Sequence, residues 1–481
     1  MKTTRCSVFI ILSILCQPPT FAQQPHTLSF TPLVFRNVSI INVTATDLQH
    51  AILPNQTVVI SAGRITAVGD KVRIPDDSQV VEASGKFLIP GLWDMHVHSM
   101  YEGRPEFFFP LLIANGVTGV RELASTLPLD TINRIRQEIA KGKILGPRFG
   151  GVTGKIIESH SQAGDRRPEF DYVAGVEEAR LLVRSRKEQG ADFIKVYNWL
   201  PRDVYFAIAD EAKKHDLPFV GHIPVFVTPA EISAEGQKSV EHLSGVSFGL
   251  SSREEQLRRE LMESRSRPMF SYLDASVTAV ETYDEKKAAA LFEQFRQNGT
   301  WHCPTYALRR ARAFINDSFI KDDPRLKYIP LSVRERWAKG PELRNEAAFR
   351  KVYLKELQLA GAMQKAGVRL LAGTDTGFGN FYTIPGFSLH DELELLVLGG
   401  LDPLEALQTA TLNPAKFFEI QKMHGTIDEG KAADLVLLDA NPLEDIGNTR
   451  TIAAVVVNGR YLPKSELQRI LSEVELAASK K

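Results

Sequence analysis

The sequence has few cysteines and no excess of charge of either sign. Its 481 residues include three cysteines, which is too few for a scaffold held together by disulfides. The 58 Lys and Arg residues balance 58 Asp and Glu residues, and this balance excludes a strongly basic nucleic-acid-binding protein. A charged fraction of 24% beside a hydrophobic fraction of 43% is also untypical of a disordered chain. What remains is a large globular protein, for which an enzyme is the default expectation.

Long hydrophobic runs are also absent, and the one short apolar run lies at the N-terminus. Residues 1–22 start with Lys2 and Arg5, continue through apolar residues 8–15 and end at Thr20-Phe21-Ala22, as in a cleaved signal peptide. The apolar run is too short to span a bilayer. We therefore predict an exported protein, periplasmic or secreted, with no transmembrane segment after cleavage. Cleavage would lower the number of basic residues from 58 to 56, giving a net charge of −2, and would leave Cys303 as the single cysteine.

Both ends of the mature chain have the pattern of β-strands. Residues 57–60 and 64–68 are separated by Ser61-Ala62-Gly63, which is typical of a hairpin. Near the C-terminus, residues 433–438 are strand-like, and residues 455–457 run into the turn pair Asn458-Gly459. We expect residues 27–89 and 423–470 to form one small β-sandwich domain together.

The middle of the chain alternates short apolar strands with amphipathic helices. Eight such units over residues 90–422 predict an α/β fold of the (β/α)₈ TIM-barrel type. Asp402-Pro403-Leu404-Glu405 has the N-cap, first-position proline and acidic residue that begin a helix, which we expect to end near Asn413-Pro414. Charged residues 308–351 are predicted to form a helical lid over the barrel. The candidate strands lie at residues 91–96, 119–123, 148–153, 193–197, 219–222, 239–242, 301–305 and 369–374.

Side chains that can bind a metal stand on five of these strands or directly after them. Barrel enzymes keep their active sites at the rim formed by the carboxyl ends of the strands. His96 and His98 are two residues apart, so in an extended segment their imidazoles share one face. In barrel order, the candidates are His96, His98, Lys195, His222, His242 and Asp375.

Each candidate has a structural alternative when it is taken alone. A histidine at a strand end is more often a hydrogen-bonded polar residue than a metal ligand, Lys195 could be a solvated strand residue, and Asp375 could cap a helix. The joint pattern favours a metal site, because ligand-type residues recur at five strand ends in one barrel.

Six sequence motifs resemble the metal-dependent amidohydrolase superfamily. Within that superfamily the chain is most similar to the imidazolonepropionase-like and Xaa-Pro dipeptidase-like branch. The resemblance covers almost the whole mature chain and implies a barrel with a β-domain. The motifs are PGLWDMHVHS at 90–99, FIKVY at 193–197, GHIP at 221–224, VEHLSG at 240–245, AGTDTG at 372–377 and GTIDEGKAADLVLLD at 425–439.

The resemblance implies two divalent metal ions. The His-x-His pair and Asp375 would hold the more buried ion, and His222 and His242 would hold the more exposed ion. Lys195 would bridge both ions as a carbamate (N6-carboxylysine), because an ammonium group has no lone pair to offer a cation. Imidazole and carboxylate ligands suit Zn²⁺ best. A hydroxide bridging the two ions would be the nucleophile, and Asp375 would carry its proton to the leaving amine.

Further side chains are weaker candidates for catalysis or substrate binding. Tyr197 lies on the same strand face as Lys195 and could bond the oxyanion, although packing inside the barrel is an equal alternative. His160 could contact substrate or be an ordinary loop histidine. Arg121 and Arg309 could pair with a substrate carboxylate or serve a structural role. The sequence Tyr197-Asn198-Trp199 replaces the glycine-rich turn of dipeptidase-like members, which weakens the case for a peptide substrate.

The sequence therefore predicts a binuclear metal-dependent hydrolase acting on the amide bond of a small-molecule substrate. A dipeptide or an N-acyl amino acid is the expected substrate. A cyclic amide such as an imidazolone, or a lactone, is the alternative. A barrel that only binds ligands is disfavoured, because all six ligand positions are filled. The sequence leaves a homo-oligomer open.

Overall fold

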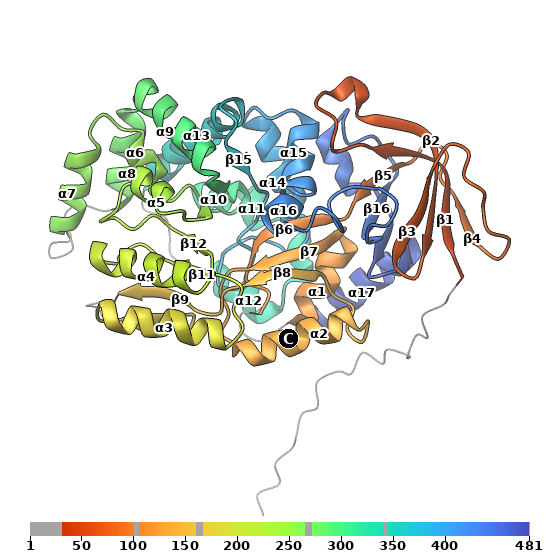
Figure 1. The fold of residues 1–481 in the computed structure, drawn as a ribbon, viewed down its shortest axis with the longest axis horizontal. Helices are drawn as coiled ribbons and strands as arrows, with labels where there is room; N and C mark the ends of the chain where they lie inside the picture. The colour runs from red at the N-terminus through yellow and green to blue at the C-terminus, as the bar shows by residue number, and fades with distance from the viewer. Residues whose placement is uncertain (1–30, 101–104, 160–166, 265–271, 341–344, 481) are drawn as a thin grey trace, which may run out of the picture.

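The computed structural model describes residues 31–100, 105–159, 167–264, 272–340 and 345–480. The predicted signal peptide and His160 lie outside the described residues. Figure 1 shows a barrel surrounded by helices, with a β-sheet from both chain ends beside it. Among the described helices, none combines the length and the apolar character needed to cross a membrane.

The barrel contains the eight strands that the sequence predicts. Neighbouring strands pair in parallel, in chain order from β6 to β8 and from β11 to β15. Their bounds are β6 (Leu92–Val97), β7 (Val117–Glu122), β8 (Arg148–Val152), β11 (Ile194–Val196), β12 (Phe219–Gly221), β13 (Ser239–Glu241), β14 (Trp301–Cys303) and β15 (Arg369–Leu370).

Backbone hydrogen bonds join these two groups of strands into a closed ring. Phe193 N donates to Val152 O at 3.3 Å and so connects β11 to β8. Met95 N donates to Ala372 O at 2.9 Å and so connects β6 to the segment that follows β15. Closure places the carboxyl ends of all eight strands at one rim, where the predicted ligands stand.

Helices cover the outside of the barrel, as the amphipathic pattern predicts (Figure 1). Asp402 caps α15 in a capping box with Glu405, as expected. The helix ends earlier than predicted, because a separate helix, α16, begins at Leu412 and contains Pro414 in its first turn. These helices are α1 (Pro105–Ala114), α2 (Leu129–Ala140), α3 (Val176–Glu188), α4 (Arg202–Lys214), α5 (Pro229–Ala234), α9 (Glu285–Asn298), α14 (Phe387–Leu398), α15 (Pro403–Thr409) and α16 (Leu412–Phe417).

Insertions after β13 and β14 add helices, and the described parts of the segment predicted to be a helical lid, residues 308–340 and 345–351, are largely helical. The long helix α13 (Glu346–Lys365) packs against α8 and α10. The other inserted helices are α6 (Val246–Gly249), α7 (Glu254–Ser264), α8 (Tyr272–Glu281), α10 (Tyr306–Ala313), α11 (Ser318–Lys321), the 3₁₀ helix η3 (Pro324–Tyr328) and α12 (Leu331–Ala338). Two strands not expected from the sequence, β9 (Ile156–Ser159) and β10 (Phe170–Val173), extend the sheet beyond β11.

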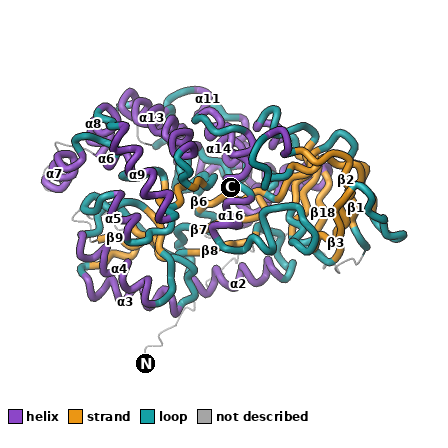
Figure 2. The backbone as a smooth tube through the Cα atoms, turned by 45° about the horizontal axis from the view of Figure 1, so that its top comes forward, coloured by secondary structure: helices purple, strands orange, loops and turns teal. Residues whose placement is uncertain are grey.

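Both chain ends build one mixed sheet, which lies at one end of the molecule in Figures 1 and 2. Its order is β18-β17-β16-β5-β1-β2-β3, with β4 paired to β1. Both predicted hairpins form, between β2 and β3 and between β17 and β18. The strands are β1 (Leu33–Ile41), β2 (Ile52–Ser61), β3 (Arg64–Gly69), β4 (Gln79–Glu82), β5 (Phe87–Pro90), β16 (Leu435–Leu438), β17 (Ile452–Val457) and β18 (Arg460–Pro463).

Apolar side chains from both ends of the chain form the core of this sheet. Phe35, Val58, Leu437 and Val456 are all buried in one cluster. The other side of β17 and β18 packs against helices α1 and α17 (Lys464–Lys480). The short 3₁₀ helices η1 (Leu48–His50) and η4 (Ile446–Arg450) lie in the same two terminal segments.

Candidate metal centre

Strand β6 brings His96 and His98 to the same side of the rim, as their spacing predicts. His96 Nε2 lies 3.2 Å from Asp375 Oδ1, and His98 Nε2 lies 2.7 Å from the same oxygen. Asp375 follows β15 in a left-handed backbone conformation, with φ of 56°. Asp375 N donates to His96 O at 2.8 Å, which fixes the carboxylate beside β6.

Lys195 and His242 reach the same point from β11 and the end of β13. Lys195 is 2% exposed, and its Nζ lies 3.2 Å from His96 Nε2. His242 Nε2 lies 3.7 Å from Asp375 Oδ2, and the His242 ring is 4.6 Å from the His96 ring between centroids. His96, His242 and Asp375 offer ligand atoms that all lie within 4.8 Å of one another.

His222, which follows β12, completes the group. Its ring centroid lies 4.9 Å from that of His242, and the two rings meet edge to face. Tyr197 packs on the other side, with a centroid distance of 4.2 Å to His222. The structure thus brings all six predicted ligands and Tyr197 to one rim, whereas His160 lies outside the described residues.

Each of the four imidazoles has a hydrogen-bond partner at Nδ1. The distances are 2.9 Å from His96 to Glu241 Oε2, 3.2 Å from His98 to Ala124 O, 2.7 Å from His222 to Asn198 Oδ1 and 2.7 Å from His242 to Thr305 Oγ1. Since the partners at His96, His98 and His222 can only accept, these rings donate through Nδ1. This arrangement leaves the Nε2 lone pairs facing the centre, as in histidines that bind metals.

The atoms at the centre fit a cation. His222 Nε2 and Asp375 Oδ1 are buried and have no hydrogen-bond partner among the described residues. With His98 donating through Nδ1, its Nε2 lone pair faces the carboxylate oxygen of Asp375 at 2.7 Å. Two electron pairs at this distance repel each other unless a cation lies between or beside them. Imidazole nitrogen and carboxylate oxygen are the donors that Zn²⁺ and related dications prefer.

A buried ion pair supports His96 from behind. Arg121 Nη2 donates to both carboxylate oxygens of Glu241 at 2.9 Å, and both side chains are fully buried. Although burial by itself would raise the pKa of Glu241, Arg121 and His96 lower it to about 2. Arg121 therefore has a structural role and is not placed to contact a substrate. His96, Glu241 and Cys303 form a second group that could hold a metal ion, but the Glu241 carboxylate is already paired with Arg121.

Lys195 and Asp375 have pKa values shifted by the same surroundings. Burial lowers the pKa of the Lys195 ammonium to about 8, against the opposing attraction of Asp375 and Glu241. For Asp375, burial raises the pKa, but positive charge at the centre, whether on the imidazoles or on a bound cation, holds it well below its ordinary value. Asp375 is therefore a carboxylate at neutral pH.

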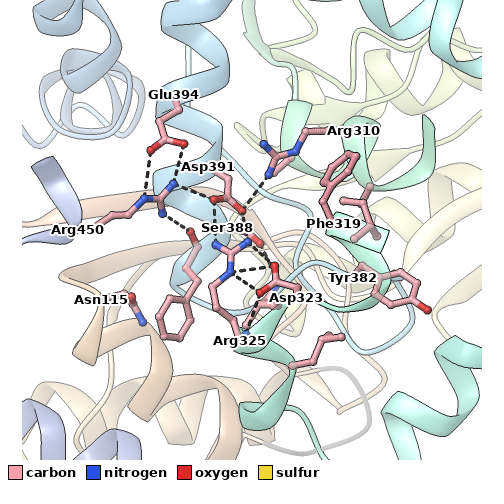
Figure 3. Close-up of a pocket in the computed structure, with 16 residues that line it drawn as sticks. Asn115, Arg310, Phe319, Asp323, Arg325, Tyr382, Ser388, Asp391, Glu394 and Arg450 are labelled. Carbon is pink, nitrogen blue, oxygen red and sulfur yellow. Dashed lines mark hydrogen bonds and ion pairs between the residues drawn. The ribbon is translucent and has the colours of Figure 1, made fainter. Parts of the chain in front are cut away.

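Two cavities open onto the candidate ligands. One, of 410 Å³, is lined by His98, Lys195, Asp375 and polar residues such as Arg167 and Asn380. The other, of 310 Å³, is lined by aromatic residues such as Phe248, by serines and by the charged Arg309 and Glu356. Tyr197, His222, His242 and Arg312 line both cavities. A third cavity, of 540 Å³, contains none of the candidate ligands (Figure 3).

Sequence reasoning missed the residues that hold the imidazoles and those that shape the cavities. The position of Glu241 could have been noticed in the sequence, because a glutamate inside a buried strand needs a partner of opposite charge or a hydrogen-bond donor. No sequence pattern indicated the roles of Asn198, Thr305 and Arg312. Each contacts its partner only because the fold brings distant segments of the chain together. Arg309, a suggested carboxylate partner, is instead paired with the buried Glu356.

The chain is similar to known proteins in sequence and in fold. Ochratoxinase from Aspergillus niger is 25% identical over 445 residues, covering 82% of this chain and 79% of the relative. The structure of the bottromycin amidohydrolase AH matches with a TM-score of 0.71 at 23% identity, covering 92% of this chain and 90% of that one. A Xaa-Pro dipeptidase with bound methionine matches with a TM-score of 0.64 at 19% identity, covering 90% and 100%.

The two structural likenesses show the fold that the chain shares with these proteins. The Amidohydrolase family profile matches residues 87–462, which include every candidate ligand and, in the terminal sheet, β5 and β16 to β18 but not β1 to β4. The chain therefore belongs to the amidohydrolase family and is a hydrolase that acts on carbon–nitrogen bonds.

Proposed function

We propose that this protein is a binuclear metal-dependent hydrolase that cleaves the amide bond of a dipeptide or an N-acyl amino acid. One observation carries the proposal. Four imidazoles and the Asp375 carboxylate gather at one rim with Lys195, whose Nζ contacts His96, and the buried atoms His222 Nε2 and Asp375 Oδ1 have no hydrogen-bond partner among the described residues.

His96, His98 and Asp375 would hold one ion, and His222 and His242 would hold the other. Lys195 would join both sites after its amine reacts with carbon dioxide, because a carbamate has two oxygens and a negative charge whereas an ammonium group has no lone pair. A pKa of about 8 supports this step, since it gives Lys195 a larger neutral fraction than an exposed lysine has. The ions would be Zn²⁺.

Two bound dications would supply Lewis acidity toward the scissile carbonyl and acidify the attacking water. Asp375 is a carboxylate at the centre of the group, so it accepts the proton of the attacking water and passes it to the leaving nitrogen. Tyr197 lines both cavities beside His222, where its hydroxyl can donate to the carbonyl oxygen as charge develops there. Burial raises the pKa of Tyr197, which keeps this hydroxyl protonated.

The names of similar proteins support an amide substrate. A Xaa-Pro dipeptidase and an amidohydrolase share this fold, and an ochratoxinase is 25% identical over 82% of the chain. A dipeptide and an N-acyl amino acid both present one amide with a carboxylate nearby.

Metal analysis tests the number of ions. We expect close to two zinc ions per chain in protein purified without chelators, and loss of amide hydrolysis when a chelator removes them. Re-addition of Zn²⁺ should restore the activity. A stoichiometry of one ion with full activity would contradict the binuclear site.

Replacing Lys195 by Ala tests the bridging residue. We expect Lys195→Ala to lower kcat by about 100-fold or more, because the residue that would join the two ions is lost. Small carboxylic acids should restore part of the activity. Lys214→Ala, at an exposed lysine on α4, is the matched control and should keep full activity. Full activity of Lys195→Ala would remove this residue from the mechanism.

We also propose that residues 1–22 direct export and are removed. N-terminal sequencing of protein recovered from outside the cytoplasm should begin at Gln23. Recovery of chains that still start at Met1 would contradict this proposal.

A further inference from the structure

The two cavities that meet at the candidate metal centre differ in chemical character. The 410 Å³ cavity is polar and includes Arg167, Glu169 and Asn380. The 310 Å³ cavity includes the aromatic side chains of Phe248, Tyr272 and Phe349, beside serines and the ion pair of Arg309 with Glu356. Because His222 and His242 line both, a substrate whose scissile amide lies at these residues extends one half into each cavity.

Arg312 lines both cavities, and its positively charged guanidinium is not paired with a carboxylate among the described residues. Its Nη2 lies 3.5 Å from Asn380 Oδ1. Asp375 attracts the guanidinium electrostatically, but Arg312 forms no ion pair with a carboxylate in the part of the chain that the structure describes. Asn380 in turn donates to Asp375 O at 2.6 Å, so it holds the guanidinium near the turn that carries Asp375. The charge of Arg312 is thus available to a ligand.

The neighbouring arginines are all neutralised within the protein. Arg309 and Arg310 lie on α10 with Arg312, yet Arg309 pairs with Glu356, and Arg310 points to Asp391 in the separate cavity of Figure 3. In the polar cavity, Arg167 pairs with Glu169. Arg312 is therefore the guanidinium at this centre that an anionic substrate group can pair with, as far as the described residues go.

The aromatic cavity is built to receive an apolar group. Phe248 and Tyr272 pack edge to face at a centroid distance of 5.3 Å, and both come from the helices inserted after β13. Phe349, on α13, is partly buried and also lines this cavity. Ring surfaces at these positions favour a flat apolar substituent.

We propose that the substrate is an amide with a carboxylate on one half and an aromatic or large apolar group on the other. Arg312 binds the carboxylate, and the cavity of Phe248, Tyr272 and Phe349 binds the apolar group. This inference rests on the proposed amide hydrolysis and adds the recognition of both halves. Arg312 is a specificity-determining residue in this arrangement, because a charge-assisted bond selects the anionic substrate over its neutral analogue.

Three simple amides test the inference with the metal-loaded full chain. N-benzoylglycine has both groups, N-methylbenzamide lacks the carboxylate, and N-acetylglycine lacks the ring. We expect kcat/KM for N-benzoylglycine to exceed that for either other amide by about tenfold or more.

Two variants test which residue binds the carboxylate half of the substrate and which binds the apolar half. Arg312→Gln should raise KM for N-benzoylglycine by about tenfold with little change in kcat, and should leave N-methylbenzamide unaffected. Phe349→Ala should raise KM for N-benzoylglycine but not for N-acetylglycine. Arg310→Gln removes the same charge from the same helix and should keep the substrate preference of the wild type, since Arg310 faces Asp391.

The outcomes separate this inference from the proposed function. Turnover of none of the three amides would overturn the proposed function and this inference with it. Turnover with equal kcat/KM for N-benzoylglycine and N-methylbenzamide, or an unchanged preference in Arg312→Gln, would overturn the inference alone.

Discussion

At the scale of single residues, Glu241 determines how His96 faces the candidate metal centre. It accepts from His96 Nδ1 at 2.9 Å while Arg121 donates to both of its oxygens. A carboxylate at this position fixes the imidazole ring and makes Nε2 more basic. Arg121 in turn compensates the charge of Glu241 in the fully buried interior, where an unpaired charge would be costly.

Replacing Glu241 by Gln should weaken both stability and metal binding. The substitution leaves Arg121 buried without a carboxylate, so we expect the free energy of unfolding to fall by about 3–5 kcal/mol. We expect zinc affinity to fall by about 10–100-fold, because the hold on His96 is weaker. Urea denaturation and zinc titration of the purified variant measure the two effects.

The double variant Arg121→Met/Glu241→Gln separates the effect on stability from the effect on zinc affinity. Removing both charges should recover much of the stability, while the zinc affinity should stay low because His96 still lacks its carboxylate. Zinc affinity equal to that of the wild type in the double variant would contradict the positioning role of Glu241.

At the scale of elements, Glu392 connects α14 to the start of α10, the helix that carries Arg312. Its Oε2 accepts from Ala307 N at 2.7 Å, whereas its Oε1 is buried without a partner among the described residues. Burial raises the pKa of Glu392 from 4.5 to about 8. The carboxyl is therefore mostly neutral in the folded protein at pH 7, whereas it ionises near its ordinary pKa in the unfolded chain.

This difference makes stability depend on pH. Because the folded-state pKa is raised, the contribution of Glu392 is fully present below pH 4.5 and is lost as the pH rises toward 8. Relative to Glu392→Gln, the wild type should lose about 1.4 kcal/mol of unfolding free energy for each pH unit in this window. Chemical denaturation of both proteins at several pH values measures the slope, and parallel curves would refute the assignment.

At the scale of the whole molecule, Asp391 joins three parts of the chain (Figure 3). Arg325 from η3 and Arg450 from η4 each lie 2.9 Å from its carboxylate, and Arg310 from α10 lies 3.2 Å away. Although burial would raise the pKa of Asp391, Arg325 and the other guanidiniums hold it below its ordinary value. One carboxylate on α14 thus connects the C-terminal segment with the helices inserted after β14.

Asp391→Asn should destabilise the protein strongly. Three guanidiniums lose their shared buried carboxylate, and we expect the free energy of unfolding to fall by about 3–5 kcal/mol. Glu394→Gln is the control, because Glu394 is 39% exposed and its pair with Arg450 should contribute less than about 1 kcal/mol. Equal losses in the two variants, measured by thermal or urea denaturation, would contradict the central role of Asp391.

Most helices and strands of this fold can be predicted from the sequence, because each produces a pattern within its own segment. A buried parallel strand is a short apolar run, and a helix repeats its apolar positions every three to four residues, so both leave signals within one segment. Asp402-Pro403 begins α15 as predicted because a cap acts on the adjacent backbone. Strands β9 and β10 were not predicted, because they follow β8 with no helix between them and so fall outside the alternation of strands and helices.

By itself, the sequence determined the eight barrel strands, the joining of both chain ends in one sheet, and the candidate ligands at the strand ends. Barrel closure explains this success, because any residue at the carboxyl end of a strand must reach the same rim. Only the tertiary structure decided what surrounds those ligands. Glu241, Asn198 and Thr305 meet their histidines, and Arg312 reaches the cavities, through contacts between distant segments. Local patterns carry no information about such contacts, so the recognition of substrate is a property of the fold.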